Sequence, residues 1–233
     1  ATNIKVLITI LGTWVLCPVI AGLIAMGFFT LTKNFILKRK IHILRLDAYT
    51  RTALLLAGAF GAYSLGANNI ANVMGVFVPI SPFTDISISS FFVFSSKEQL
   101  FLLGGIAIAV GVFTYSKRVM FTVGSDLLKL SPVAAFIVVI SHSIVLFLFA
   151  SQGISNFLQS INLPSIPLVP VSSSQAVVGA VIGIGLLKGG KEVQWSIAGR
   201  ITIGWFALPI IAAIISMFLL FILQNIFNLT VSF

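Results

Sequence analysis

Between Thr52 and Ile80 the sequence reads TALLLAGAFGAYSLGANNIANVMGVFVPI, a run without a charged side chain. It is longer than the roughly 20 residues that an α-helix needs to cross a bilayer. Its middle nevertheless holds three carboxamides, Asn68, Asn69 and Asn72, at a depth where lipid offers no hydrogen bonds. Because Asn and Gly also disfavour helix, we predict an unwound turn here that binds a cation or a substrate. The alternative is that the asparagines only hydrogen-bond a neighbouring helix.

The whole chain has the composition of a membrane protein. Of its 233 residues, 58% are hydrophobic and 8% are charged, which excludes an ordinary soluble domain. The net charge of +9 is compatible with nucleic-acid binding, but the charges cluster between apolar runs, as they do in cytoplasmic loops. We therefore expect the lipid bilayer, and no nucleic acid, as a partner. The single cysteine, Cys17, excludes a disulfide framework within the chain and is expected to be a packing residue.

The apolar runs predict five membrane spans and one marginal one. They are Val6–Leu31, Thr52–Ile80, Gln99–Ser116, Pro132–Ala150 and Ile201–Asn228, with the marginal run at Val171–Leu187. The basic segment Lys33–Arg51 has the apolar spacing of an amphipathic interfacial helix. The segment Ser81–Glu98 is rich in turn residues. The uncharged segment Ser151–Pro170 contains three prolines, so we expect little helix there and contact with the membrane.

The basic residues predict how the chain is oriented. Apart from Lys5 and Lys97, the 14 Lys and Arg residues lie in the segments 33–51, 117–129 and 188–200. Cytoplasmic loops carry an excess of Lys and Arg, so these three segments are expected inside the cell. The alternation then places both chain ends outside the plasma membrane.

Two short sequences indicate an internal repeat. WVLCPVIAG at Trp14–Gly22 resembles WFALPIIAA at Trp205–Ala213, and the predicted spans run in opposite directions. Inverted-topology repeats are typical of secondary transporters. On this interpretation residues 1–32 are the last helix of a first repeat, 33–51 are a basic cytoplasmic linker, and 52–233 are a second repeat. The alternative is chance similarity between two apolar helices.

A second polar break precedes the marginal span. The sequence PVSSSQ at Pro170–Gln175 places a proline and a serine cluster ahead of an apolar run, which is an N-terminal capping signal. A helix N-terminus carries unsatisfied N–H groups and a partial positive charge, both of which attract an oxyanion. We therefore predict that Ser172, Ser173 and Ser174 bind an oxyanion. Capping without a ligand is the alternative.

Three glycines follow this break, Gly179, Gly183 and Gly185. Small residues let membrane helices approach closely. We expect the glycine face to pack against the span Thr52–Ile80.

No catalytic pair is recognisable at membrane depth. His142, between Ser141 and Ser143, is a candidate proton relay, although a neutral ring hydrogen-bonded to hydroxyls is the favoured interpretation. The carboxylates lie outside the predicted spans; they are Asp47, Asp85, Glu98, Asp126 and Glu192. The predicted spans therefore contain no carboxylate pair for acid–base catalysis, and we expect neither an enzyme nor an organic cofactor.

The two polar motifs together resemble those of a known family. GANNIAN at Gly66–Asn72 and PVSSSQ at Pro170–Gln175 resemble, in order, spacing and direction, the signatures Gly-Ala-Asn-Asp-x-x-Asn and Pro-x-Ser-Ser/Thr-Ser/Thr-His of the inorganic phosphate transporter (PiT) family of cation-coupled anion symporters. Gly179-Ala180 follows as in the family. The resemblance implies an all-α integral membrane protein, an inverted-repeat secondary transporter half with a broken helix and a re-entrant or half-helix segment.

The resemblance also implies roles for the motif residues. The oxyanion, phosphate ahead of sulfate, would be bound by Ser172, Ser173, Ser174, Gln175 and Asn68. The coupling sodium ion or proton would be held by Asn68, Asn69 and Asn72, with Asn69 and Asn72 as direct sodium ligands. Further partners implied are the missing first-repeat half, in the same or another chain, and a second copy in a homodimer.

Two departures from the family pattern leave the substrate open. Asn69 stands where the family usually has Asp, and Gln175 where it usually has His. Losing a carboxylate at Asn69 weakens a sodium site and also suits a substrate whose charge differs from that of phosphate. An anion channel and a membrane-embedded enzyme or assembly subunit are the other function classes that we consider.

Overall fold

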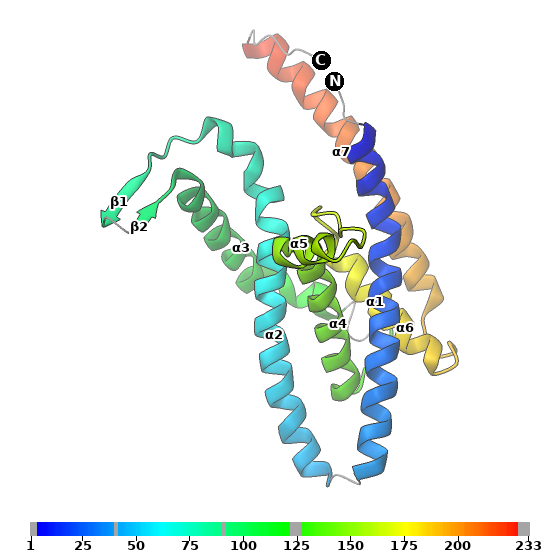
Figure 1. Ribbon diagram of the computed structural model, residues 1–233. Coiled ribbons are helices and arrows are strands. Elements are labelled where there is room, and N and C mark those ends of the chain that lie inside the picture. Colours follow the sequence, from blue (N-terminus) through cyan, green and yellow to red (C-terminus); the bar gives the residue numbers. More distant parts are fainter. Residues whose placement is uncertain (1–3, 40–41, 90–91, 122–126, 228–233) are drawn as a thin grey trace. The chain divides into compact units, whose positions relative to one another are not determined.

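A computed structural model describes residues 4–39, 42–89, 92–121 and 127–227 of the chain. These residues are mostly helical, with one short β-hairpin (Figure 1). The chain forms two compact units, one that extends to Val193 and one that begins at Gln194. The predicted helical architecture is therefore confirmed.

The basic segment Lys33–Arg51 does not form a separate interfacial helix, contrary to our expectation. Helix α1 (Ile4–Arg39) continues through Lys33, because neither Pro nor Gly interrupts the chain after Leu31. Helix α2 (Ile43–Met74) begins within the same segment, where the Nδ1 atom of His42 accepts a hydrogen bond from Leu44 N at 3.4 Å. Two long helices thus divide the basic residues between their ends.

Helix α2 is continuous through Gly66–Asn72, so the predicted unwound turn is wrong. Only at Gly75 does the backbone change, to the 3-10 helix η1 (Gly75–Ile80). The low helix propensity of Asn costs less than about 1 kcal/mol per residue, whereas an unsatisfied backbone group in an apolar medium costs several. Keeping the helix is therefore the more favourable solution, and the side chains of Asn68 and Asn69 hydrogen-bond to backbone groups.

The turn-rich segment before the third long helix contains an antiparallel hairpin that the sequence did not predict. Strand β1 (Ile86–Ser89) pairs with β2 (Phe92–Phe94), with Ile86 opposite Phe94. Helix α3 (Ser96–Phe121) follows at once, and Asp85 Oδ1 accepts a hydrogen bond from Ser96 N at 2.7 Å. The basic segment after α3 lies partly outside the described residues.

Helix α4 (Pro132–Ala150) coincides with its predicted span, because Ser131 Oγ caps its start by accepting from Ala134 N at 3.3 Å. The expectation of little helix after Ala150 is wrong for the first half of the following segment. Helix α5 (Gln152–Ser160) forms there, capped by Ser151. All three prolines of the segment come after α5, so none of them obstructs it.

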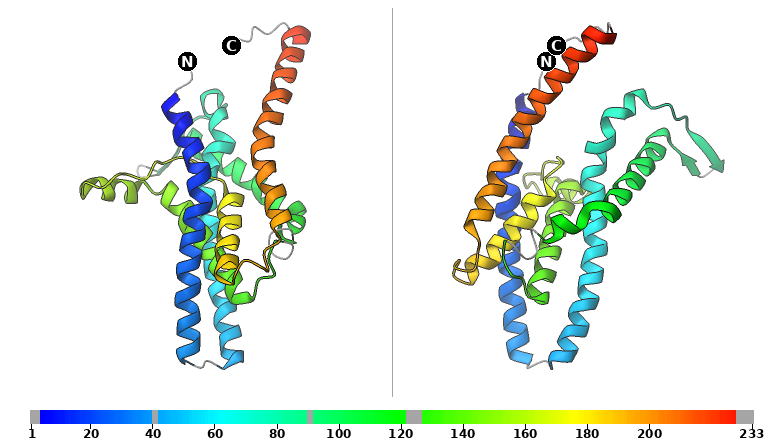
Figure 2. Two further views of the ribbon diagram at one scale, coloured as in Figure 1. Left: turned by 90° about the vertical axis from the view of Figure 1, so that its right-hand side faces the viewer. Right: turned by 180° about the vertical axis from the view of Figure 1, so that it is seen from behind.

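Helix α6 (Ser173–Leu187) lies in the core of the first unit. It packs along α1, and α2 packs along α4, while α4 also contacts both α1 and α6. Figure 2 shows α6 beside α1 in both views. The fully buried side chains of this unit come largely from α4 and α6, among them Ile137, Leu146, Val181 and Ile184.

The glycine face of α6 packs against α1, and not against α2 as we expected. A Cβ atom added at Gly179 would overlap the Pro18 carbonyl, and one at Gly183 would lie 2.5 Å from Gly22 O. The contact is thus between backbones, as small residues in membrane helices permit. Gly185 instead faces Val193.

The second unit contains helix α7 (Trp195–Phe227), which runs on through Pro209. Both Trp-x-x-x-Pro sequences, at Trp14 in α1 and Trp205 in α7, therefore lie inside long continuous helices. Their inverted relation and the proposed repeat boundaries stay predictions.

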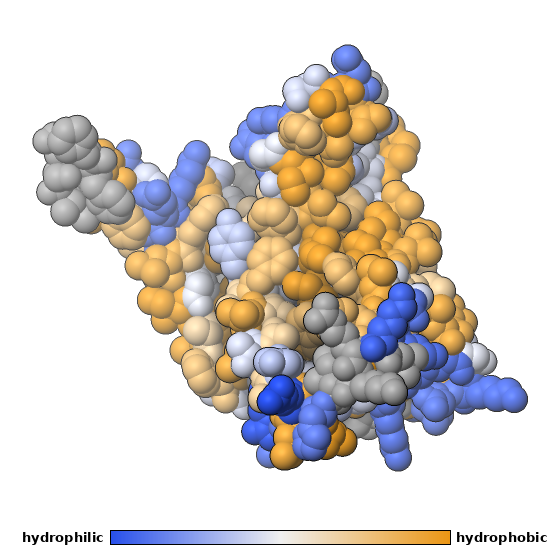
Figure 3. Space-filling model, turned by 60° about the horizontal axis from the view of Figure 1, so that its bottom comes forward, coloured by the Kyte–Doolittle hydropathy of each residue, from blue (hydrophilic) through white to orange (hydrophobic). Residues whose placement is uncertain are grey.

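Four helices are long and apolar enough to cross a membrane, judged by length and composition over the described residues. They are Ile8–Ile36, Ser96–Lys117, Pro132–Ala150 and Trp195–Ile226, so the predicted span Thr52–Ile80, in α2, is not among them. The shorter apolar helix Ser173–Leu187 does not reach that length. Figure 3 shows hydrophobic side chains over broad outer surfaces of the helices, as contact with lipid requires. The chain is a multi-pass membrane protein.

The close contact between α1 and α6 predicts a large effect of one methyl group. Gly179→Ala should lower the free energy of unfolding by about 1–3 kcal/mol, because Pro18 opposes the new Cβ with backbone atoms that cannot move aside. Gly58→Ala on α2, where nothing lies within 4 Å, is the matched control and should be neutral or stabilising. Thermal midpoints of the purified variants in detergent measure both effects. Equal midpoints for the two variants would contradict the packing.

Candidate functional site

The start of α6 gathers three serine hydroxyls, which we call the serine turn (Ser172, Ser173 and Ser174). Ser172 is the N-cap residue, and its Oγ accepts a hydrogen bond from Gln175 N at 3.4 Å. The same Oγ lies 3.0 Å from the Oγ of Ser174. The capping predicted from the sequence is therefore confirmed. Free helix N–H groups and hydroxyls stand together here without a charged residue, since the segment 151–175 has none.

Asn68 of α2 anchors the chain immediately before the serine turn. Its Oδ1 accepts a hydrogen bond from Val171 N at 3.0 Å, and the two residues are 6% and 2% exposed. The preceding residue is Pro170, which has no N–H group, so the Val171 N–H is the first donor on the approach to the helix. The two motifs singled out in the sequence thus meet directly, although 103 residues separate them.

Two further helices contact the serine turn. From α4, His142 Nε2 lies 2.8 Å from Ser173 Oγ. From α1, Cys17 Sγ donates to the Ser172 carbonyl at 3.7 Å. A hydroxyl partner for His142 was expected, but nothing in the sequence indicated that Ser173 would supply it. Three helices, α1, α2 and α4, therefore hold the beginning of α6.

Two buried polar atoms near this region have no hydrogen-bond partner among the described residues. They are Gln175 Oε1 and Ser141 Oγ, whose residues are 5% and 0% exposed. Leaving a buried polar group unsatisfied costs about 1–3 kcal/mol, so both atoms are candidates for a hydrogen bond to a bound water or ligand group. Gln175 belongs to the first turn of α6, directly after the three serines.

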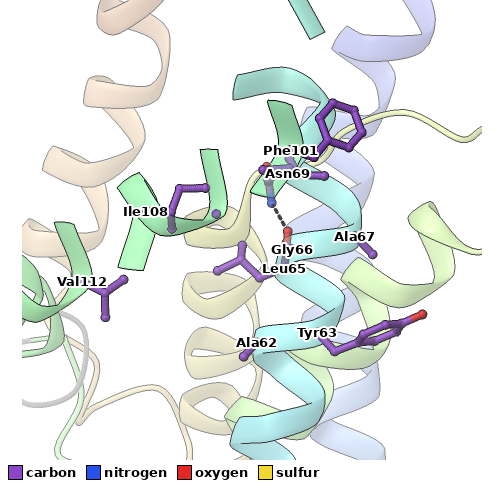
Figure 4. A pocket seen from close by; sticks show the side chains of 11 residues that line it. Ala62, Tyr63, Leu65, Gly66, Ala67, Asn69, Phe101, Ile108 and Val112 are labelled. Atoms are coloured by element: carbon purple, nitrogen blue, oxygen red, sulfur yellow. Dashed lines mark hydrogen bonds between the residues drawn. The ribbon is translucent and has the colours of Figure 1, made fainter. Parts of the chain in front are cut away.

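Asn69 points to a different place from Asn68. It lines a cavity of about 680 Å³ between α2 and α3, whose walls include Gly66, Phe101 and Ile108 (Figure 4). Its Nδ2 donates to Leu65 O at 3.3 Å, the dashed line in Figure 4, and within the described residues this is the hydrogen bond that its side chain makes. Asn72 is exposed. Of the predicted residues, the structure brings Asn68 to the serine turn and places Asn69 against α3.

From Gly66 to Ala71, α2 offers a cation only side-chain oxygens. Because the helix continues to Met74, the backbone carbonyls of this stretch accept helical hydrogen bonds, the last of them from Gly75 N, and are not free to coordinate an ion. No group of three or more His, Cys, Asp or Glu residues occurs among the described residues. Hard cations such as sodium bind oxygen, so carboxamides and hydroxyls are the ligands that this chain supplies there.

Comparisons with known proteins agree with one another. The sequence model of the Phosphate transporter family matches residues 1–156 and 163–231. The chain is 30% identical over 215 residues to a Methanocaldococcus jannaschii protein named as a phosphate permease, and 26% identical over 162 residues to sodium-dependent phosphate transporter 1 of Homo sapiens. A solved structure described as the sodium-dependent phosphate transporter matches with a TM-score of 0.66 at 22% identity, which shows a shared fold.

The chain spans only part of these proteins. The match to the Methanocaldococcus protein covers 92% of this chain and 60% of that protein. For the human transporter the shares are 70% and 22%, and for the solved structure they are 96% and 68%. The relatives therefore contain sequence that has no counterpart here.

The bond between Asn68 and Val171 predicts a specific loss of stability. Asn68→Ala should cost about 1–3 kcal/mol, because it leaves a buried N–H without an acceptor. Asn72→Ala, one helical turn later and exposed, should change the free energy of unfolding by no more than about 0.5 kcal/mol. Thermal midpoints compare the variants, and amide hydrogen exchange at Val171 reports the broken bond directly. Unchanged exchange at Val171 in Asn68→Ala would count against the assignment.

Proposed function

This chain belongs to the phosphate transporter family, a family of transporters and not of enzymes, and we propose that it forms part of a symporter for inorganic phosphate. The observation that carries the proposal is the serine turn, held by the hydrogen bond between Asn68 and Val171. The family resemblance inferred from the two sequence motifs is confirmed. The proposed substrate-binding residues are Ser172, Ser173, Ser174, Gln175 and Asn68, with Asn68 acting through its anchoring bond.

The chemistry of the serine turn favours an oxyanion. Unpaired N–H groups at the start of a helix, together with hydroxyls, donate hydrogen bonds to anions and need no neighbouring cation. A fixed positive side chain would bind an anion more strongly, but it would be costly at this depth and would hinder release. A neutral site of oriented dipoles suits a transporter, which must both bind and release its substrate.

The free acceptor at Gln175 supports phosphate over sulfate. Phosphate keeps at least one P–OH group at neutral pH, whereas sulfate carries no proton and offers acceptors only. The proposed contact is between that P–OH group and Gln175 Oε1, a buried oxygen without a partner among the described residues; sulfate has no proton to donate to it. The names of the relatives also favour phosphate, since they are described as a phosphate permease and a sodium-dependent phosphate transporter.

Sodium is the proposed coupling ion, because two of the similar proteins are described as sodium-dependent. The proposed ligand atoms are the carboxamide oxygens of Asn69 and Asn72 on α2, because Asn68 Oδ1 accepts from Val171 N and faces the serine turn. Asn69 Oδ1 is free for this role, since only its Nδ2 is bonded within the helix. Without an aspartate at this position the site carries no formal charge, so we expect weak sodium affinity.

A complete pathway needs more than this chain. The chain covers 60% of the Methanocaldococcus protein, and only one pair of signature motifs occurs in it. We propose that a first-repeat half, in the same or another polypeptide, supplies the second pair. We also propose that the protein lies in the plasma membrane with both ends of this segment outside the cell. A homodimer is the proposed assembly.

Transport assays test the role of the serine turn. Replacing Ser173 and Ser174 by Ala in the full-length protein should raise the apparent KM for phosphate on the order of tenfold, because a hydrogen bond to a charged group contributes about 1.5–3 kcal/mol. Ser160→Ala, at the exposed end of α5, is the matched control and should leave KM unchanged. Radiolabelled phosphate uptake into proteoliposomes gives KM, and unlabelled sulfate should compete poorly. Unchanged kinetics in the double variant would reject the assignment, and sulfate competing as well as phosphate would reject the substrate.

The position of Asn69 predicts how a negative charge at this residue changes the response of the protein to sodium. Asn69→Asp should increase the sodium dependence of the thermal midpoint, because a carboxylate adds a full charge to the free oxygen and a ligand of the folded state raises stability. Potassium at the same ionic strength is the control. A variant whose midpoint falls, with no larger sodium response than the parent, would show that Asn69 only supports the helix.

A further inference from the structure

We propose that the Nε2–H group of His142 donates to Ser173 Oγ and thereby directs the Ser173 proton to the transported anion, which makes His142 a positioning residue. The inference rests on the proposed function of the serine turn. Its observation is independent of the family motifs, since His142 lies in α4, outside both of them.

The geometry joins two helices at the binding residue itself. His142 Nε2 and Ser173 Oγ are 2.8 Å apart, a short hydrogen bond, and Ser173 is the first residue of α6. The ring comes from the interior of α4, whose neighbouring Ser141 and Ser143 are fully buried. Ser143 Oγ is engaged with the Val139 carbonyl at 2.6 Å, so it does not compete for the ring. The contact therefore fixes where the Ser173 hydroxyl points.

The number of available protons shows why this contact matters. Each serine hydroxyl has one proton to donate. Ser172 and Ser174 are bonded to each other, so one of their two protons is used within the pair. The third hydroxyl, that of Ser173, faces His142. Whether the serine turn offers an anion one hydroxyl donor or two thus depends on the His142 ring.

The two neutral forms of the imidazole have opposite consequences. If Nε2 is unprotonated, Ser173 donates to the ring and turns only lone pairs to an anion, which repels it. If Nε2 carries the proton, Ser173 accepts from the ring, and its own proton is free for an anion oxygen. Anion binding therefore selects the form with the proton on Nε2. Because the imidazole stays neutral in this arrangement, no buried charge is needed.

A double-mutant cycle in the full-length protein tests the inference. His142→Leu removes the donor with little change in volume and should raise the apparent KM for phosphate on the order of tenfold. In a Ser173→Ala background the same change should alter KM by less than about twofold, because no hydroxyl is left to orient. His142→Gln places an amide donor near the position of Nε2 and should restore KM to within about threefold of the parent. Uptake into proteoliposomes measures KM and the maximal rate separately.

The outcomes distinguish this inference from the proposed function. A parent protein without saturable phosphate uptake would overturn the proposed function and the inference with it. A parent that transports phosphate, combined with equal effects of His142→Leu in both backgrounds or with no rescue by Gln, would overturn the inference alone. A loss confined to the maximal rate would also contradict it, because damage to the fold lowers the amount of active protein without changing KM.

A spectroscopic measurement tests the protonation of His142 in the parent protein and uses a variant only to assign the signals. Nitrogen-15 shifts of histidine distinguish protonated from unprotonated ring nitrogens, and the His142 signals are assigned by their absence from His142→Gln. In the phosphate-loaded parent, Nε2 should be protonated. An unprotonated Nε2 in that state would overturn the proposal whatever the kinetics show.

Discussion

The hydrogen bond from Val171 N–H to Asn68 Oδ1 is the contact on which the arrangement of the site depends. Lipid cannot satisfy a backbone donor, and the residues before α6 are not helical, so this N–H needs a partner from elsewhere in the protein. A carboxamide on a continuous helix supplies it without opening that helix. The polar motif of α2 therefore acts through its side chains, and the position of α6 is set from a rigid element.

Close packing between the backbones of α1 and α6 also holds α6 in place. Gly179 and Gly183 let α6 approach Pro18 and Gly22 of α1, a distance that any side chain would increase. Cys17, next to Pro18, reaches the Ser172 carbonyl. The proposed anion site is made of neutral dipoles and has no strong charge to attract an anion, so its affinity would come from donors that are already oriented. Close helix packing and the anchoring bond together provide that orientation.

The sequence predicted those features that depend on local signals and failed where the partner is distant. Ser131 before Pro132 marked the start of α4, and the serine cluster after Pro170 marked the start of α6. The break predicted in α2 was wrong because propensity favours a turn there only in water. The predicted neighbour of the glycine face was wrong, because the spacing of glycines shows that a helix packs closely but does not show which helix it packs against. The contact of His142 with Ser173 has no sequence signal, since it depends on how α4 and α6 cross.

The two departures from the family signatures fall at separate places in the structure, which bears on how substrate and cation are recognised. Successive residues of an α-helix point about 100° apart, so Asn68 and Asn69 face different neighbours. Asn68 serves the serine turn, where Gln175 replaces the usual histidine, whereas Asn69, which replaces the usual aspartate, faces α3 across the cavity. One departure therefore lies at the proposed substrate site and the other at the proposed cation site. Because both motif asparagines belong to one rigid helix, a cation that binds beside Asn69 and shifts α2 would also shift the anchor of the serine turn, which is a direct physical route for coupling.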